Sequence, residues 1–218
     1  MNLEFAPVFA DFDALLRGAV VTVEVTAGAL LLGCVIGLLV GVGRLNPQRW
    51  IVYNLCSVYL LFFRGTPLLV QLFIWFFGLP QFGLTLPAFA CGVLGLGMYS
   101  GAYVSEIVRG AIQSVDRGQT EAARSLGMSS GQAMRVIILP QAVVRMIPPL
   151  GNQCIISLKD SSLFIVIGVA ELTRQGQEIM ASNFRAVEIW SAVAIIYLIL
   201  TGLMAMSLHL VEKRMRIL

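Results

Sequence analysis

The stretch GAVVTVEVTAGALLLGCVIGLLVGVG, Gly18 to Gly43, contains a single charged side chain, Glu24. A helix rises about 1.5 Å per residue, so roughly 20 apolar residues cross a hydrocarbon layer roughly 30 Å thick. This stretch therefore predicts a transmembrane helix. The whole chain is 58% hydrophobic and 12% charged, with a mean hydropathy of +0.85. These values lie far from those of soluble domains and predict a polytopic, all-α membrane protein.

Further apolar windows extend this pattern along the chain. Together they predict about five transmembrane helices, at about residues 18–43, 55–78, 86–108, 148–172 and 189–210, after an N-terminal segment 1–17. The second window contains Arg64 and Pro67, and the fourth contains Lys159 and Asp160. Both interruptions need a reason, because charge and broken backbone pairing are costly at bilayer depth.

The basic residues lie mainly in every second loop, and this distribution predicts how the chain is oriented across the membrane. They cluster after the first, third and fifth windows: Arg44, Arg49; Arg109, Arg117, Arg124, Arg135, Arg145; Lys213, Arg214, Arg216. By the positive-inside rule, the N-terminus and segment 1–17 lie outside, in the periplasm. The loop 109–145 and the C-terminus are cytoplasmic. This asymmetry accounts for the net charge of +3, and nucleic acid is not an expected partner.

The cytoplasmic loop predicts two short capped helices. Asp116 precedes Gln119 by three residues, and Ser129 precedes Gln132 by three, which is the spacing of reciprocal capping at a helix start. Gly127 stands where the first helix would end, since glycine adopts the left-handed conformation most readily. A helix pair lying on the lipid headgroups would give the same pattern.

A resemblance favours another role for this loop. Glu121-Ala122-Ala123, then Gly127, then Ile138-Leu139-Pro140 resemble the EAA signature of ABC importer permeases. In that family the loop carries the coupling helix, which docks in the cytoplasmic ATPase. The resemblance assigns ATPase coupling to one short run: Glu121, Ala122, Ala123, Leu126, Gly127 and Met128.

The resemblance covers nearly the whole chain and is weakest in the first sixty residues. It is carried by 64–71, 100–110, 148–153, 157–163 and 171–178, which look like the polar amino-acid family of type I permeases and most resemble its glutamine permeases. It implies a type I (MetI-like) transmembrane domain over 18–212. It further implies a bacterial inner-membrane location, a second permease subunit, identical or homologous, two cytoplasmic ABC ATPase subunits and an external amino-acid-binding protein.

The chain itself carries no phosphate-binding loop. Its lysines, Lys159 and Lys213, do not follow glycine as the Gly-x-x-x-x-Gly-Lys-Ser/Thr motif requires. We therefore expect no bound cofactor, with ATP and Mg used by the partner ATPase. The single histidine, His209, and the scattered cysteines show no metal or redox spacing. A transport subunit rather than an enzyme is expected, with no metal site.

The interrupted windows suggest a substrate site. Adjacent side chains on a helix diverge by about 100° and pair poorly with each other, so Lys159 and Asp160 each require a different partner of opposite charge. A zwitterionic amino acid supplies both. In this hypothesis Asp160 receives the ammonium, and Lys159 or Arg64 holds the carboxylate. The hydrogen bonds come from three hydroxyls: Ser161, Ser162 and Thr66.

Structural alternatives remain for these charges. In one alternative, Lys159 pairs with Glu24 or Glu106 and holds helices together. Apart from this pairing, no role is assigned to Glu24. Arg64 is a cytoplasmic anchor if the second span starts near Gly65, and lies at mid-depth if it starts near Ile51. Glu106 and Arg109, three residues apart, predict an intrahelical ion pair.

The expected function is a permease subunit for a polar L-amino acid, glutamine first, driven by ATP through the loop. Glutamate, aspartate, basic amino acids and cystine stay open as substrates. An ion-gradient-driven secondary transporter is the alternative, although the chain shows no convincing inverted repeat. A membrane scaffold subunit would not need the polar cluster 159–162.

Overall fold

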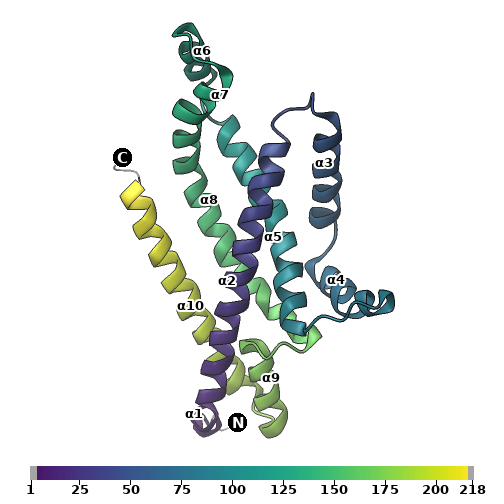
Figure 1. Cartoon of the computed structure of the whole chain (residues 1–218). Coiled ribbons are helices and arrows are strands. Elements are labelled where there is room, and N and C mark those ends of the chain that lie inside the picture. Colours follow the sequence, from purple (N-terminus) through teal and green to yellow (C-terminus); the bar gives the residue numbers. More distant parts are fainter. Residues whose placement is uncertain (1–3, 216–218) are drawn as a thin grey trace.

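The computed structural model describes residues 4–215, which are helical throughout apart from short turns and connections (Figure 1). The α-helices are α1 Ala6–Ala10, α2 Phe12–Gly43, α3 Trp50–Gly65, α4 Leu68–Phe73, α5 Ala88–Gln113, α6 Arg117–Ser125, α7 Ser130–Ala133, α8 Leu139–Asp160, α9 Leu172–Asn183 and α10 Ala186–Met215. Two π-helical turns, η1 Ile74–Gly78 and η3 Met134–Ile138, and two 3-10 segments, η2 Leu79–Phe82 and η4 Ser161–Ile167, complete them. Residues 1–3 of the expected N-terminal segment, and Arg216, lie outside the described residues.

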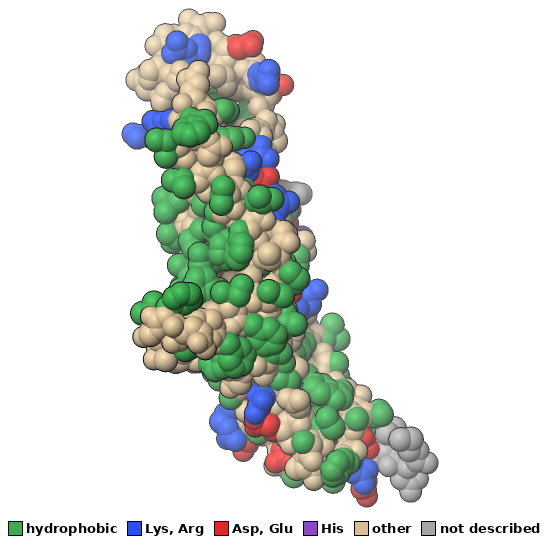
Figure 2. Space-filling model, turned by 90° about the vertical axis from the view of Figure 1, so that its right-hand side faces the viewer, with side chains coloured by type: hydrophobic (Ala, Val, Ile, Leu, Met, Phe, Trp, Pro, Cys, Tyr) green, Lys and Arg blue, Asp and Glu red, His purple; other side chains and the backbone are tan. Residues whose placement is uncertain are grey.

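Four stretches are long and apolar enough to cross a membrane, and a bent pair makes up to five. The pair is α3 with residues 68–82, whose axes differ by 104°. α6 and α7 project at one end of the molecule, here named the coupling end, and α1 and α9 lie at the other (Figure 1). Figure 2 shows hydrophobic side chains along the middle and charged side chains gathering toward both ends. The expected all-α membrane fold is confirmed.

Glycines on α2 allow it to pack directly on α5. A Cβ atom at Gly37 would lie 2.4 Å from Val104 Cγ1, and one at Gly33 would lie 2.5 Å from Ser100 Oγ. No side chain larger than a hydrogen fits there, so the two backbones approach closely, as in other small-residue interfaces between membrane helices. The α2–α5 pair is the framework on which the remaining helices pack.

The second expected span, 55–78, is longer and broken in the structure. α3 begins at Trp50, and Thr66 and Pro67 take an extended conformation before α4 starts at Leu68. Arg64 therefore lies at the far end of a helix that starts at the coupling end, about 21 Å along its axis from Trp50. The start at Trp50 matches the longer of the two spans considered, and the depth of Arg64 in a membrane stays a prediction.

The fourth expected span, 148–172, differs at both ends. α8 begins at Leu139 directly after the π-helical turn η3, so the helical stretch runs unbroken from Ser130 and includes Pro140. Pro148 and Pro149 are accommodated inside α8, as prolines are in membrane helices. α8 stops at Asp160, and the chain continues as 3-10 turns to Gly168, whose φ is +79°. Lys159 and Asp160 thus end a helix rather than occupying its middle.

The other spans shift by a few residues. The expected 86–108 is α5, which runs on to Gln113, and the expected 189–210 is α10, which extends at both ends. The expected loop 109–145 contains the end of α5, the helices α6 and α7, η3 and the start of α8.

Candidate functional site

Both short helices at the coupling end begin at their predicted N-caps, but of the two predicted reciprocal pairs the structure shows only Ser129 with Gln132, and α7 continues directly into η3. Asp116 Oδ1 accepts a hydrogen bond from the Gly118 amide at 2.7 Å, and Ser129 and Gln132 form a complete reciprocal capping box. Gly127 has φ +83°, and Arg124 Nη1 donates to the Met128 carbonyl at 3.0 Å. The turn between α6 and α7 is therefore held by local bonds, which gives this element a defined shape.

α6 has two distinct faces. Ala123 is 4% exposed and packs toward its own chain, whereas Leu126 is 81% exposed. Glu121, Ala122 and Gly127 are also exposed, and Met128 is half-buried. The predicted coupling residues thus divide into an outward-facing group, which is free to meet a partner, and Ala123, which sets the spacing between α6 and the body of the chain.

A charge cluster joins α2, α3 and α5. Glu106 on α5 forms an ion pair with Arg44 at the end of α2, and its Oε2 lies 2.7 Å from Arg109 Nη2. Arg64 Nη1 is 3.8 Å from the same oxygen. The Glu106–Arg109 pair is the one predicted from their spacing. One carboxylate facing three guanidinium groups leaves the cluster positively charged.

This cluster borders a cavity of about 480 Å³. Its lining contains both charged and apolar side chains: Arg44, Ser57, Leu60, Leu61, Arg64, Gly65, Tyr103 and Glu106. The Arg64 guanidinium lies 5.6 Å from the centre of the Tyr103 ring, within the range of a cation–π contact. Arg64 is nearly half exposed at its side chain, so its charge faces this space.

Gln71 supports the break between α3 and α4. Pro67, four residues after Phe63, has no N–H to donate to the Phe63 carbonyl. Gln71 Nε2 donates to that carbonyl at 3.1 Å and to the Thr66 carbonyl at 3.2 Å. Gln71 is 1% exposed. Sequence reasoning identified the costly break in backbone pairing but not this residue; a glutamine four residues after a proline in an apolar window was the available signal.

Arg64 and Asp160, two of the residues predicted to hold a substrate, lie near different side chains of α5 and do not form one compact site. The Tyr99 and Tyr103 hydroxyls are 3.1 Å apart on α5. The half-buried Asp160 lies within electrostatic range of Tyr99, and Arg64 lies against Tyr103. Asp160 and Arg64 therefore stand at opposite ends of a tyrosine pair.

The remaining predicted substrate contacts differ in availability. Ser161 is fully buried and donates to the Leu158 carbonyl at 2.6 Å, and Thr66 donates to the Phe62 carbonyl at 2.8 Å. Both hydroxyls are thus bonded to their own backbone. Ser162 is half-buried and Lys159 is exposed.

The alternative ion-pair partners of Lys159 are not brought to it. Glu106 is surrounded by three arginines, and Glu24 is exposed on α2. Within residues 4–215, Lys159 forms no ion pair. The positive charge of Lys159 therefore remains available to bind an anionic group at the end of α8.

Sequence reasoning also missed Glu171, which is fully buried at the start of α9. Its carboxylate accepts hydrogen bonds from the Thr173 and Arg174 amides at 2.8 and 2.7 Å and from the Tyr197 hydroxyl at 3.0 Å. Burial raises the pKa of this carboxyl above its ordinary value, although these three donors favour the charged form. Glu171 thereby fixes α9 to α10 at the end opposite α6.

A model of one protein family accounts for most of the chain. The family described as "Binding-protein-dependent transport system inner membrane component" matches residues 31–217. The chain belongs to this family. Membership in this transport-component family confirms the expectation of a membrane permease subunit rather than an enzyme.

Individual amino-acid permeases agree with this assignment over most or all of their length. The chain is 47% identical to the glutamine transport system permease protein GlnP of Escherichia coli (strain K12), with 100% of both proteins covered. It is 40% identical to the L-cystine transport system permease protein TcyL of Bacillus subtilis (strain 168), covering 90% of this chain and 84% of the relative. The resemblance to amino-acid permeases of ABC importers is confirmed.

Solved structures show the same fold. The crystal structure of an amino acid ABC transporter with histidines superposes with a TM-score of 0.93 at 40% identity, covering 98% of this chain and 100% of that one. An inward-facing MetNI methionine ABC transporter superposes with a TM-score of 0.78 at 22% identity, covering 94% and 97%. The expected MetI-like permease core is therefore confirmed.

Proposed function

We propose that the chain is the permease subunit of an ATP-driven importer for a polar L-amino acid, with glutamine as the first candidate. The observation that carries the proposal is the full-length 47% identity to a glutamine transport permease. The 40% identity to an L-cystine permease keeps cystine as the second candidate. Specificity in such systems resides largely in the external binding protein, so a binding screen on that protein separates the candidates.

The proposed assembly has a second permease subunit, two cytoplasmic ABC ATPase subunits that use ATP and Mg, and an external amino-acid-binding protein. Family membership supports the ATPase and the binding protein. In the proposed topology the N-terminus lies outside, α6 and the C-terminus face the cytoplasm, and the membrane is the bacterial inner membrane. The charge parity of the loops supports this orientation.

In this proposal the outward face of α6 carries ATPase coupling. Exposed Leu126, Glu121 and Ala122 provide the contact surface, and Gly127 and Met128 hold the turn that follows it. Ala123 keeps α6 against the body of the chain, so that a force on α6 reaches the membrane helices. ATP then has to favour one global arrangement of the permease pair over another.

The substrate is proposed to pass along the Asp160–Tyr99–Tyr103–Arg64 track. Asp160 offers a carboxylate for the ammonium, and Arg64 offers a guanidinium for the carboxylate, with Lys159 and Ser162 beside Asp160. Thr66 and Ser161 are proposed to shape the backbone of the site, because their hydroxyl protons are donated to carbonyls.

Reconstitution tests the proposal. The permease, its ATPase and its binding protein are placed in proteoliposomes, and uptake of labelled glutamine is measured with ATP, without ATP, and with a sodium or proton gradient alone. Uptake that requires ATP and the binding protein supports the proposal, and uptake driven by an ion gradient alone overturns it. Asp160→Ala should abolish uptake with assembly intact, whereas Asp13→Ala, at the exposed start of α2, should not.

A further inference from the structure

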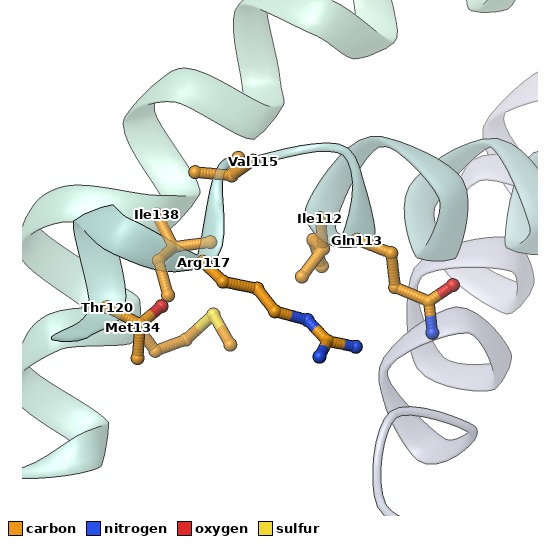
Figure 3. Close-up of a pocket in the computed structure, with 7 residues that line it drawn as sticks. All are labelled: Ile112, Gln113, Val115, Arg117, Thr120, Met134 and Ile138. Carbon is orange, nitrogen blue, oxygen red and sulfur yellow. The ribbon is translucent and has the colours of Figure 1, made fainter.

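A second cavity, of about 410 Å³, lies between the end of α5, the start of α6 and η3. Figure 3 shows its lining: Ile112, Gln113, Val115, Arg117, Thr120, Met134 and Ile138. The Arg117 side chain runs past Met134, and its guanidinium points toward Ile112 and Gln113 (Figure 3). The cavity is separate from the tyrosine track.

The polar side chains of this cavity offer hydrogen-bond donors and a positive charge. The Arg117 side chain forms no ion pair or hydrogen bond with another side chain among the residues that the structure describes. Gln113 already accepts from Arg109 Nη1 through Oε1 at 2.9 Å, which leaves its NH₂ group to donate. Thr120 adds a hydroxyl, and the lining contains no carboxylate. Such a set suits an anion with several acceptor oxygens.

The cavity lies where two sides of α6 meet. Thr120 is half-buried and lies three residues before the buried Ala123, on the side of α6 that packs on the body of the chain. Arg117 is exposed and lies one turn before the exposed Glu121. A ligand in the cavity therefore lies beside the surface of α6 that a partner protein would meet.

The apolar lining places the cavity at the edge of the membrane-spanning region. Ile112, Val115 and Ile138 belong to one buried apolar cluster, and α5, a candidate span, ends at Gln113. The last turns of α5 carry Glu106, Arg109 and Gln113, so its apolar part ends near Val108 and Arg117 lies beyond it, on the headgroup side. Basic pockets at this level recognise anionic lipids.

We propose that this cavity binds the phosphate group of an anionic phospholipid, with Arg117 as the charged contact and Gln113 and Thr120 as donors. The inference rests on membership in the membrane transport-component family and does not depend on which amino acid is carried. A bound headgroup would brace α6 against α5 and thereby make the coupling element sensitive to lipid composition. Free phosphate has the same chemistry, and the experiment separates the two sources.

The test uses the assembled transporter in nanodiscs of phosphatidylcholine with or without phosphatidylglycerol, and native mass spectrometry after detergent release. The wild type should retain phosphatidylglycerol, and Arg117→Gln should lower its retention about five- to tenfold, the effect of removing one favourable cation–phosphate contact. Arg117→Lys keeps the charge and should retain most of the lipid. The matched control is Arg135→Gln, which removes an exposed positive charge nearby that does not line the cavity.

Three results would overturn the proposal. Equal loss of lipid in Arg117→Gln and Arg135→Gln would indicate general surface attraction. Displacement of phosphatidylglycerol by millimolar inorganic phosphate would identify free phosphate as the ligand. Unchanged lipid retention together with loss of ATPase co-purification in Arg117→Gln would make the cavity part of a protein interface.

Discussion

Gln71 Nε2 donates to the carbonyl oxygen of Phe63, eight residues earlier and on the other side of a 104° bend. This bond replaces the one that Pro67 cannot supply. A carbonyl left unpaired in an apolar surrounding costs about 1–3 kcal/mol. The bend that brings Arg64 to Tyr103 is therefore stabilised by one amide side chain.

Gln71→Leu should destabilise the protein by about 1–3 kcal/mol, because it leaves the Phe63 and Thr66 carbonyls without this donor. It should also reduce uptake, since the position of Arg64 depends on the bend. Thermal unfolding of the purified protein in detergent and uptake in proteoliposomes measure the two effects. Gln81→Leu, on an exposed turn, is the control, and equal effects of the two substitutions would contradict the prediction.

Glu106→Gln should destabilise the protein by about 1–2 kcal/mol, because three arginines then repel one another in a half-buried cluster. Adding Arg44→Gln should recover part of this loss, since Arg44 is the least exposed arginine of the three. A double-mutant cycle on thermal unfolding measures the coupling. Glu178→Gln, in an exposed pair with Arg174, should change stability by less than about 0.5 kcal/mol. Strictly additive effects at Glu106 and Arg44 would show that the cluster does not act as a unit.

Gly37→Ala should cost about 1–3 kcal/mol, because its Cβ atom would meet Val104 at 2.4 and 2.6 Å and push α2 from α5. Gly110→Ala is the matched control, since a Cβ atom there meets nothing within 4 Å. The control should be neutral or gain up to about 1 kcal/mol from helix propensity. Thermal unfolding of both variants in detergent measures the difference, and similar stabilities would exclude close α2–α5 packing.

Two substitutions on α6 should separate docking from packing. Leu126→Asp should weaken ATPase association about tenfold without changing permease stability, because the side chain is 81% exposed. Ala123→Leu should instead destabilise the permease, because that site is buried. Co-purification with the ATPase and thermal unfolding of the permease alone report the two effects. An Ala123→Leu variant that unfolds normally and only fails to bind the ATPase would place Ala123 on the docking face.

Glu171 should make stability fall as pH rises. Its pKa is raised by burial in the folded state, so between the ordinary glutamate pKa and this raised value the folded state holds more protons than the unfolded state. Linkage then lowers the free energy of unfolding with increasing pH across that interval. Glu171→Gln should remove this slope, whereas Glu178→Gln should keep it, as measured by thermal unfolding across the acidic range. An unchanged slope in Glu171→Gln would assign the dependence to another group.

The sequence predicts the elements whose determinants are local. An apolar run such as Gly18 to Gly43 can only be satisfied as a helix in lipid, and Ser129 with Gln132 define a helix start through bonds three residues apart. By contrast, whether Pro148 and Pro149 break α8 and where α3 starts depend on the segments that pack against them, which the sequence does not show locally.

The candidate site was predicted in part for the same reason. Charges inside apolar windows are conspicuous, so Arg64 and Asp160 could be selected from the sequence. Their relation through Tyr99 and Tyr103 could not, because it depends on how α3 and α8 pack around α5. Gln71 and Glu171 act through contacts with distant or broken backbone, which a composition pattern does not encode.

The break after Gly65 has an electrostatic consequence. A helix carries about half an elementary negative charge at its C-terminus, and α3 ends where Arg64 lies against Tyr103. No such end lies at Asp160, because 3-10 turns continue the helical backbone from α8 to Ile167. The dipole of α3 therefore offsets part of the positive charge of Arg64 at one end of the tyrosine pair only.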